Sequence, residues 1–145
     1  MAKKKKRKQG NTAARTMEWL RKKGYTVAKV ERWNAWAHIR QDLFGFIDLV
    51  AIHPDHTGVL AVQTTHSNFF DDHKSKLFKD KKVAPKIRIW LQGDNRLWMF
   101  GWNKYWKGQT QRKIWAPVVE EVTLGVTNRK KFYFRKVEEI QNAGK

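Results

Sequence analysis

The sequence contains no cysteine and few acidic residues. Without cysteine the chain can form neither a disulfide nor a thiolate zinc site, and a reducing compartment is compatible with it. Its apolar runs are shorter than the roughly 20 residues that a membrane-spanning helix needs, and it shows no signal-peptide pattern. We therefore expect no membrane partner and a cytoplasmic location, either near the nucleoid or in a virus-infected host cell.

The shortage of acidic residues leaves the chain strongly basic. Lys and Arg number 31 against 13 Asp and Glu, which gives a formal net charge of +18 over 145 residues. This charge exceeds what solubility requires and predicts a polyanionic partner such as DNA. Eight Trp and eight Phe argue against disorder over most of the chain and offer either core or surfaces for base stacking.

The first ten residues, MAKKKKRKQG, have no apolar periodicity, and their like charges repel one another. We predict a disordered basic arm over residues 1–10 and a single domain over 11–145. The arm fits phosphate binding, nuclear localisation or a plain solvated tail. Its candidate nucleic-acid-binding residues are Lys3, Lys4, Lys5, Lys6, Arg7 and Lys8.

Local patterns predict the order helix, three strands, helix and further strands, which is typical of an α/β domain around a mixed sheet. Asn11 or Thr12 is expected to cap the first helix, and Gly24 to end it. The C-terminal stretch, 128–145, fits either a strand or a helix. The expected elements are a helix over 11–24, a strand over 25–33, an irregular connection over 33–42, strands over 46–52 and 59–65, a helix over 67–82, and strands over 86–92, 96–102 and 113–122.

An acidic residue, Asp48, interrupts the apolar strand FIDLVAI. If the turn after this strand closes so that Ile52 faces Val59, Asp48 lies directly opposite Gln63 in the strand VLAVQTT. Thr65 then points to the same side as Gln63, because side chains alternate along a strand. The sequence thus predicts a carboxylate, an amide oxygen and a hydroxyl at one edge of an apolar sheet.

Burying an ionised carboxylate without a partner costs several kcal/mol, so Asp48 needs a cation or a dense hydrogen-bond network. A hard divalent ion such as Mg²⁺ or Mn²⁺ would satisfy it with oxygen ligands. The alternative is an ion pair with Arg40 or a nearby lysine. Spacing alone does not separate these two interpretations.

The succession of helix, strand, GFIDLVAI, turn, VLAVQTT and helix resembles the PD-(D/E)XK nuclease superfamily, and within it the Holliday-junction-resolvase-like and phage-type endonucleases. The resemblance covers about residues 11–92. It implies a restriction-endonuclease-like core and Mg²⁺-dependent cleavage of DNA. Asp48 matches the metal-binding aspartate, Gln63 stands where the Glu of the ExK signature usually lies, and Glu18 resembles a helix glutamate that some of these enzymes add to the metal site.

The chain departs from the family pattern at two positions. Gln63 is neutral, and Thr65 occupies the position of the catalytic lysine without supplying its charge. A cation from another element, Lys74, Lys76 or Arg40, could replace that lysine. Two functions follow: a Mg²⁺- or Mn²⁺-dependent endonuclease acting on branched DNA such as Holliday junctions, as a homodimer and without a small-molecule cofactor, or a non-catalytic nucleic-acid-binding protein that keeps the fold.

Histidines and aromatic residues offer further candidates. The HPDHTG turn, residues 53–58, could bind a transition metal, although a turn exposes such residues anyway. His66 directly follows the strand that ends at Thr65 and is the histidine nearest the proposed site. Trp33, Trp36 and the aromatic residues of 98–106 could stack on unpaired bases, but their alternation at 98, 100 and 102 indicates a core-facing strand side.

Overall fold

The computed structural model describes residues 11–106, 108 and 112–137. The basic arm predicted over 1–10 lies outside these residues. Within them, no helix is long and apolar enough to cross a membrane. The elements are α1 (Thr12–Lys22), β1 (Thr26–Lys29), β2 (Arg32–Asn34), β3 (Ile39–Gln41), β4 (Leu49–His53), β5 (His56–His66), the short 3₁₀ helix η1 (Ser67–Phe69), α2 (Phe70–Lys79), α3 (Ala84–Gln92), β6 (Arg96–Trp106), β7 (Lys113–Leu124) and β8 (Phe132–Lys136).

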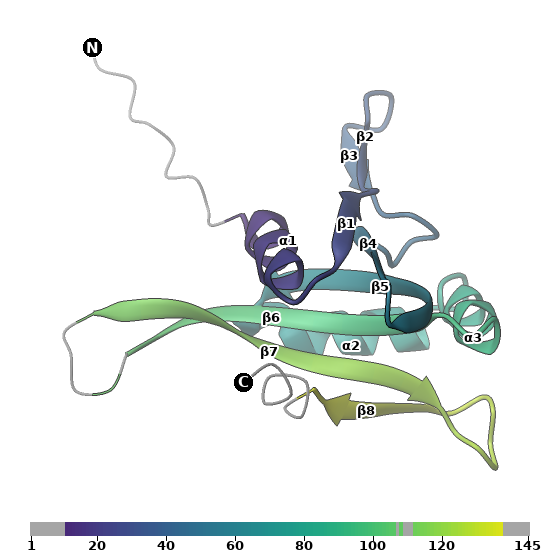
Figure 1. The fold of residues 1–145 in the computed structure, drawn as a ribbon. Helices are drawn as coiled ribbons and strands as arrows, with labels where there is room; N and C mark the ends of the chain where they lie inside the picture. The colour runs from purple at the N-terminus through teal and green to yellow at the C-terminus, as the bar shows by residue number, and fades with distance from the viewer. Residues whose placement is uncertain (1–10, 107, 109–111, 138–145) are drawn as a thin grey trace.

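A six-stranded mixed sheet in the order β1-β4-β5-β6-β7-β8 forms the centre of the molecule (Figure 1). Strands β5 and β6 run parallel, with α2 and α3 in the connection between them, and the other neighbouring strands pair antiparallel. Strands β2 and β3 form a separate hairpin that stands away from this sheet. The predicted α/β class with a mixed sheet flanked by helices is confirmed.

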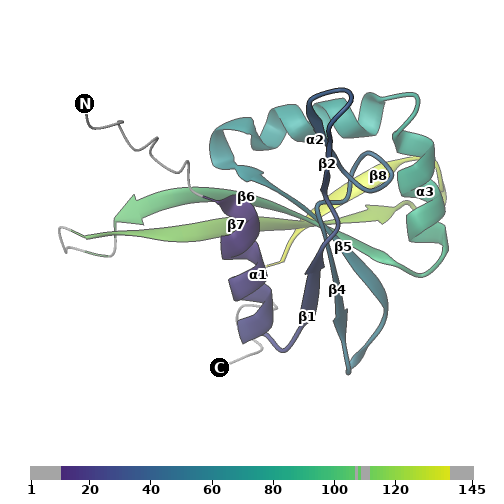
Figure 2. The ribbon, with the colours of Figure 1, turned by 90° about the horizontal axis from the view of Figure 1, so that it is seen from above.

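The helices cover both faces of the sheet (Figure 2). On one face α1 packs Leu20 against the buried rings of Trp98, Phe100 and Trp102, so the predicted core-facing side of β6 is confirmed. On the other face α2 and α3 pack against the opposite side chains of the same strands; this second cluster includes Phe46, Ile47, Ala61, Phe70, Ile87, Leu97 and Met99. Strands β5 and β6 therefore bury both of their faces along their central parts.

The first helix begins and ends where the sequence predicts. Asn11 is its N-cap, and its Oδ1 accepts a hydrogen bond from the backbone N–H of Ala14 over 3.0 Å. After the helix, Gly24 adopts a φ of 91°, a left-handed conformation that suits glycine.

The register between β4 and β5 agrees with the prediction along the inner part of the hairpin but not at its turn. Leu49 pairs with Val62, which leaves Asp48 next to Gln63, as expected. The expected pairing of Ile52 with Val59 is wrong, because the register shifts between Ala51 and His53, and His53 pairs with His56. This irregularity makes β5 begin at His56, earlier than predicted.

Two other segments differ from the prediction. Residues 86–92, expected to be a strand, belong to α3, which carries a Pro in its first turn and buries Ile87 against the sheet. The connection expected to be irregular over 33–42 contains most of the β2–β3 hairpin. Within the ambiguous C-terminal stretch, 132–136 form strand β8, and residues 138–145 lie outside the described part of the chain.

Candidate functional site

A hollow of about 750 Å³ lies where the N-terminus of α1, the end of β1, the base of the β2–β3 hairpin and strand β5 meet. Of the three polar residues that the sequence singles out here, Asp48 and Gln63 line it, and Thr65 does not. The residues that line it are Asn11, Thr12, Ala13, Lys29, Glu31, Arg40, Asp42, Asp48, Gln63, Thr64 and His73.

Three carboxylates converge in this hollow. Glu31 precedes β2, Asp42 follows β3 and Asp48 precedes β4. One carboxylate oxygen of each lies within 4.8 Å of those of the other two. The hairpin brings Glu31 and Asp42 together, because β2 begins at Arg32 directly opposite Gln41, where β3 ends. Sequence reasoning missed both residues, since it placed Glu31 in a single strand over 25–33 and Asp42 at the end of an irregular connection over 33–42.

Asp48 is held by the backbone on either side of it. Its side chain is only 6% exposed, and its Oδ2 accepts a hydrogen bond from the Thr64 backbone N–H over 2.9 Å. Its own backbone N–H donates to the Val62 carbonyl, and its carbonyl oxygen accepts from Val30, each over 3.0 Å. These contacts fix the carboxylate at the point where β4 begins beside β5.

The environment of Asp48 disfavours its charged form in the absence of a cation. Burial is the main cause that raises the pKa of Asp48 to about 9. A side-chain hydrogen bond with Asp42, the negative charge of Asp42 and the negative charge of Glu31 contribute to the same rise. The alternative ion pair of Asp48 with Arg40 is not formed, because the Arg40 guanidinium faces Glu31 with a distance of 3.8 Å from Nε to Oε1. No lysine or arginine of the described chain forms an ion pair with Asp48.

Gln63 supplies a second oxygen to the same hollow. Its Nε2 lies 3.4 Å from Nδ1 of His73. Burial, and then the charge of Lys76, lower the pKa of His73, so the neutral ring can accept this hydrogen bond. The Oε1 atom of Gln63 is buried and has no hydrogen-bond partner among the described residues. A buried carbonyl oxygen without a partner is costly, and Gln63 lines the same hollow as the three carboxylates.

The donor set fits a hard divalent cation. Carboxylate and amide oxygens are the protein ligands that Mg²⁺ and Mn²⁺ prefer, and a hollow of this size leaves room for water in the remaining positions. Asp48, Asp42 and Glu31 would hold the ion, and Gln63 lines the same hollow. Without a cation, negative charges on these three crowded carboxyl groups repel one another. The charge of a bound divalent ion would offset this repulsion.

Two cationic side chains line the hollow, Lys29 and Arg40. Sequence reasoning named Arg40 and overlooked Lys29, which ends β1 opposite Leu49, the neighbour of Asp48. The other two candidates lie elsewhere. The Lys74 Nζ atom binds Glu120 on β7 over 2.9 Å, and Lys76 lies on the exposed side of α2 and does not line the hollow.

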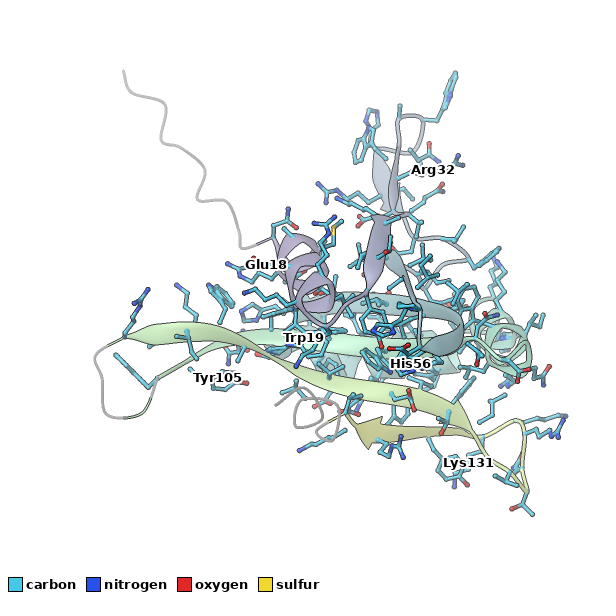
Figure 3. All side chains as sticks on the ribbon, viewed as in Figure 1. Glu18, Trp19, Arg32, His56, Tyr105 and Lys131 are labelled. Carbon is cyan, nitrogen blue, oxygen red and sulfur yellow. The ribbon has the colours of Figure 1, made fainter. Side chains whose placement is uncertain are left out.

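The structure does not bring Glu18 or Thr65 into the hollow. Glu18 is exposed on α1 (Figure 3), pairs with Lys22 over 3.2 Å and lines a different depression between α1 and β7. Thr65 is buried beside Gly101 of β6, two residues after Gln63 on β5, and it does not line the hollow.

The histidines of the 53–58 turn have structural partners. Both ring nitrogens of His53 contact backbone groups: Nε2 lies 3.2 Å from the Lys23 carbonyl oxygen, and Nδ1 accepts from the Asp55 N–H over 3.0 Å. The ring of His56 stacks on Tyr25. His66 caps η1, with its Nδ1 3.4 Å from the backbone N of Asn68. These contacts leave the acidic hollow as the better candidate for a metal centre.

Comparison of the chain with protein-family models, with curated proteins and with solved structures found no match. Its function therefore has to be inferred from its own residues and their geometry.

Proposed function

We propose that this protein is a metal-dependent endonuclease with a restriction-endonuclease-like core, and that it cuts branched DNA. The observation that carries the proposal is the convergence of Glu31, Asp42 and Asp48 in one hollow. Gln63 lines the same hollow, and its buried amide oxygen has no partner among the described residues. The chain has a net charge of +18, yet three of its few carboxylates lie together, an arrangement that is unfavourable without a cation. A divalent cation and a phosphodiester backbone together account for this arrangement.

The arrangement of the elements supports the resemblance to the PD-(D/E)XK superfamily. Helix α1 is followed by the three antiparallel strands β1, β4 and β5, then by helices, and then by β6 parallel to β5. Asp48 stands at the start of the second of these strands and Gln63 near the end of the third. The resemblance assigns metal-binding residues to these two positions.

A bound Mg²⁺ or Mn²⁺ ion supplies charge stabilisation to the scissile phosphate and a more acidic water. The chain's own groups have distinct tasks. The Thr64 amide holds the Asp48 carboxylate, and His73 accepts from the Gln63 amide and so fixes the Gln63 side chain. Lys29 binds a phosphate oxygen and stabilises the charge that grows on it, which replaces the lysine missing at position 65.

Two observations favour a second candidate, a nucleic-acid-binding protein without cleavage activity. Gln63 provides a neutral ligand where the family has a carboxylate, and the side chain of Thr65 lies outside the hollow. Both departures weaken a catalytic centre and leave the basic surface unchanged. A homodimer is proposed for either function, because a two-fold protein matches the symmetry of a four-way junction.

Cleavage of labelled four-way junction, flap and linear duplex DNA, with and without Mg²⁺, separates the two candidates. The wild type is expected to cut a branched substrate when Mg²⁺ or Mn²⁺ is present, and the Asp48→Asn variant to bind that substrate without cutting it. Glu18→Gln serves as the matched control, because Glu18 is exposed and lies outside the hollow. Cleavage by folded Asp48→Asn at the wild-type rate would reject the metal site, and binding without cleavage by the wild type would favour the second candidate.

A further inference from the structure

The β2–β3 hairpin carries large apolar side chains that belong to neither hydrophobic cluster of the described residues. Trp36, in the turn, is 97% exposed, and Trp33 and Ile39 are 58% and 50% exposed. The hairpin stands away from the sheet in Figure 1, and its side chains, Arg32 among them, project outward in Figure 3. A two-stranded hairpin gains little stability by itself, so these side chains are not explained by a core of its own.

The tip of the hairpin has a defined shape. The Asn34 Oδ1 atom accepts hydrogen bonds from the backbone N–H groups of Trp36 and Ala37, over 3.0 and 3.2 Å. His38 closes the turn with a φ of 52°, and its ring meets the edge of Trp33 at 6.3 Å between centroids. Trp36 is therefore presented on an ordered turn.

The charge on the hairpin indicates what it contacts. Residues 32–41 contain no acidic residue, and they carry Arg32, His38 and Arg40 beside the two tryptophans. Exposed aromatic rings beside cationic side chains are the combination with which proteins bind unpaired nucleotides, because the rings stack on bases while the cations bind phosphates.

The base of the hairpin lies in the acidic hollow. Glu31 immediately precedes β2, and Asp42 immediately follows β3, so the two strands connect the tip directly to the candidate metal ligands. At about 3.3 Å per residue, the tip lies no more than about 20 Å from those carboxylates. At about 3.4 Å per nucleotide along a strand, this reach corresponds to no more than about six nucleotides.

We propose that Trp36 is a specificity residue that stacks on an unpaired base at the branch point of the DNA, and that the hairpin thereby sets the distance from the branch to the cut. This inference rests on the proposed function, since it identifies the feature of the substrate that the same site recognises. Cuts should fall within about six nucleotides of the branch point.

The test measures binding in the Asp48→Asn background, where the DNA stays intact. The probes are a flap with 2-aminopurine at the branch point and a linear duplex of equal length. Trp36→Ala is expected to weaken flap binding by at least about fivefold, to leave duplex binding unchanged and to abolish the change in 2-aminopurine fluorescence. Trp36→Tyr, which keeps an aromatic ring, should restore most of the effect. Trp106→Ala removes a tryptophan that is 60% exposed but lies on β6, and it serves as the control.

Equal losses on flap and duplex, or the same loss for Trp106→Ala, would overturn the inference. Conversion of a dimer into a monomer by Trp36→Ala, seen by light scattering, would also overturn it, since the tip would then contact a second copy of the chain. Flap binding that depends on Trp36 in a protein that never cleaves DNA would support base stacking by Trp36 and reject both the endonuclease and the distance to the cut. Cleavage that is indifferent to Trp36 would reject the inference alone.

Discussion

The backbone N–H of Thr64 donates a hydrogen bond to Asp48 Oδ2 over 2.9 Å, and the hydroxyl of the same threonine lies 2.8 Å from Thr16 Oγ1 on α1. The Thr16 hydroxyl in turn accepts from the indole N–H of Trp102 over 2.8 Å. These contacts connect the acidic hollow to the core through buried polar groups. The position of Asp48 therefore depends on how α1 packs on the sheet.

The first prediction concerns this buried chain of hydrogen bonds. Thr16→Val keeps the shape of the side chain and leaves the Trp102 indole N–H without its partner. Leaving a buried donor unsatisfied costs about 1–3 kcal/mol, so the Tm should fall by roughly 3–10 °C. Thr123→Val, at an exposed position of β7, should leave the Tm nearly unchanged. Thermal unfolding followed by circular dichroism measures both; equal Tm values for the two variants would contradict the assigned role of Thr16.

The second prediction concerns the stability of the metal-free protein. Asp48→Asn removes a buried carboxyl group from beside Asp42 and Glu31, and the amide oxygen can still accept from Thr64. The Tm in EDTA at pH 8 should therefore stay the same or rise by a few degrees, since about 1 kcal/mol corresponds to roughly 3 °C in a chain of this size. A clear fall in Tm would mean that Asp48 is stabilised by a cationic side chain.

The third prediction concerns metal affinity. Gln63→Glu adds a carboxylate to the hollow and should tighten Mg²⁺ binding, because hard cations prefer charged oxygen ligands. The increase in Tm on adding Mg²⁺ should grow accordingly, since a ligand at 100 times its Kd stabilises the folded state by about 2.7 kcal/mol. Gln92→Glu, at the exposed end of α3, is the control for added charge. An identical Mg²⁺ response in the two variants would place Gln63 outside the metal site.

The fourth prediction separates phosphate stabilisation from metal binding. Lys29→Met should lower kcat by about a hundredfold at saturating Mg²⁺ while leaving the Mg²⁺-induced change in Tm as it is. Lys79→Met removes a charge from the exposed end of α2 and should keep the wild-type kcat. Single-turnover cleavage of a branched substrate gives both rates. Equal rates for the two variants would exclude Lys29 as the replacement for the missing lysine.

The fifth prediction concerns the basic arm. With six cationic residues between Lys3 and Lys8, deletion of residues 1–10 should reduce the number of phosphate contacts. Each contact contributes a slope of roughly 0.9 to the fall of log K with log salt, so the slope should flatten by a few units. Binding to duplex DNA between about 50 and 200 mM salt measures it. An unchanged slope would show that the arm takes no part in binding.

The parts of the fold that sequence reasoning predicted are those with local signals. Asn11 and Gly24 mark the ends of α1 by their capping chemistry, and the alternation at 98, 100 and 102 marks the core side of β6. Residues 86–92 were misassigned because a short apolar run fits a strand or a helix equally well. The proline at position 85 was the available signal for a helix start.

Local sequence signals likewise mark only part of the candidate site. Asp48 and Gln63 were found because each interrupts an apolar strand. Glu31 and Asp42 interrupt no apolar strand pattern, since each lies next to a strand of the exposed hairpin. They come close to each other only because β2 pairs with β3. Trp33 and Trp36 were considered for stacking, but their exposure becomes evident only when the hairpin is seen apart from the sheet.

The parallel pairing of β5 with β6 has a consequence for synthesis of the protein. Every residue that lines the acidic hollow precedes β6 in the chain, yet β6 covers one edge of β5, the strand that carries Gln63 and Thr64. A nascent chain that has not yet reached Arg96 exposes that edge of β5, and unpaired strand edges promote aggregation. The ribosome therefore completes the candidate catalytic residues before it completes the strand that protects them.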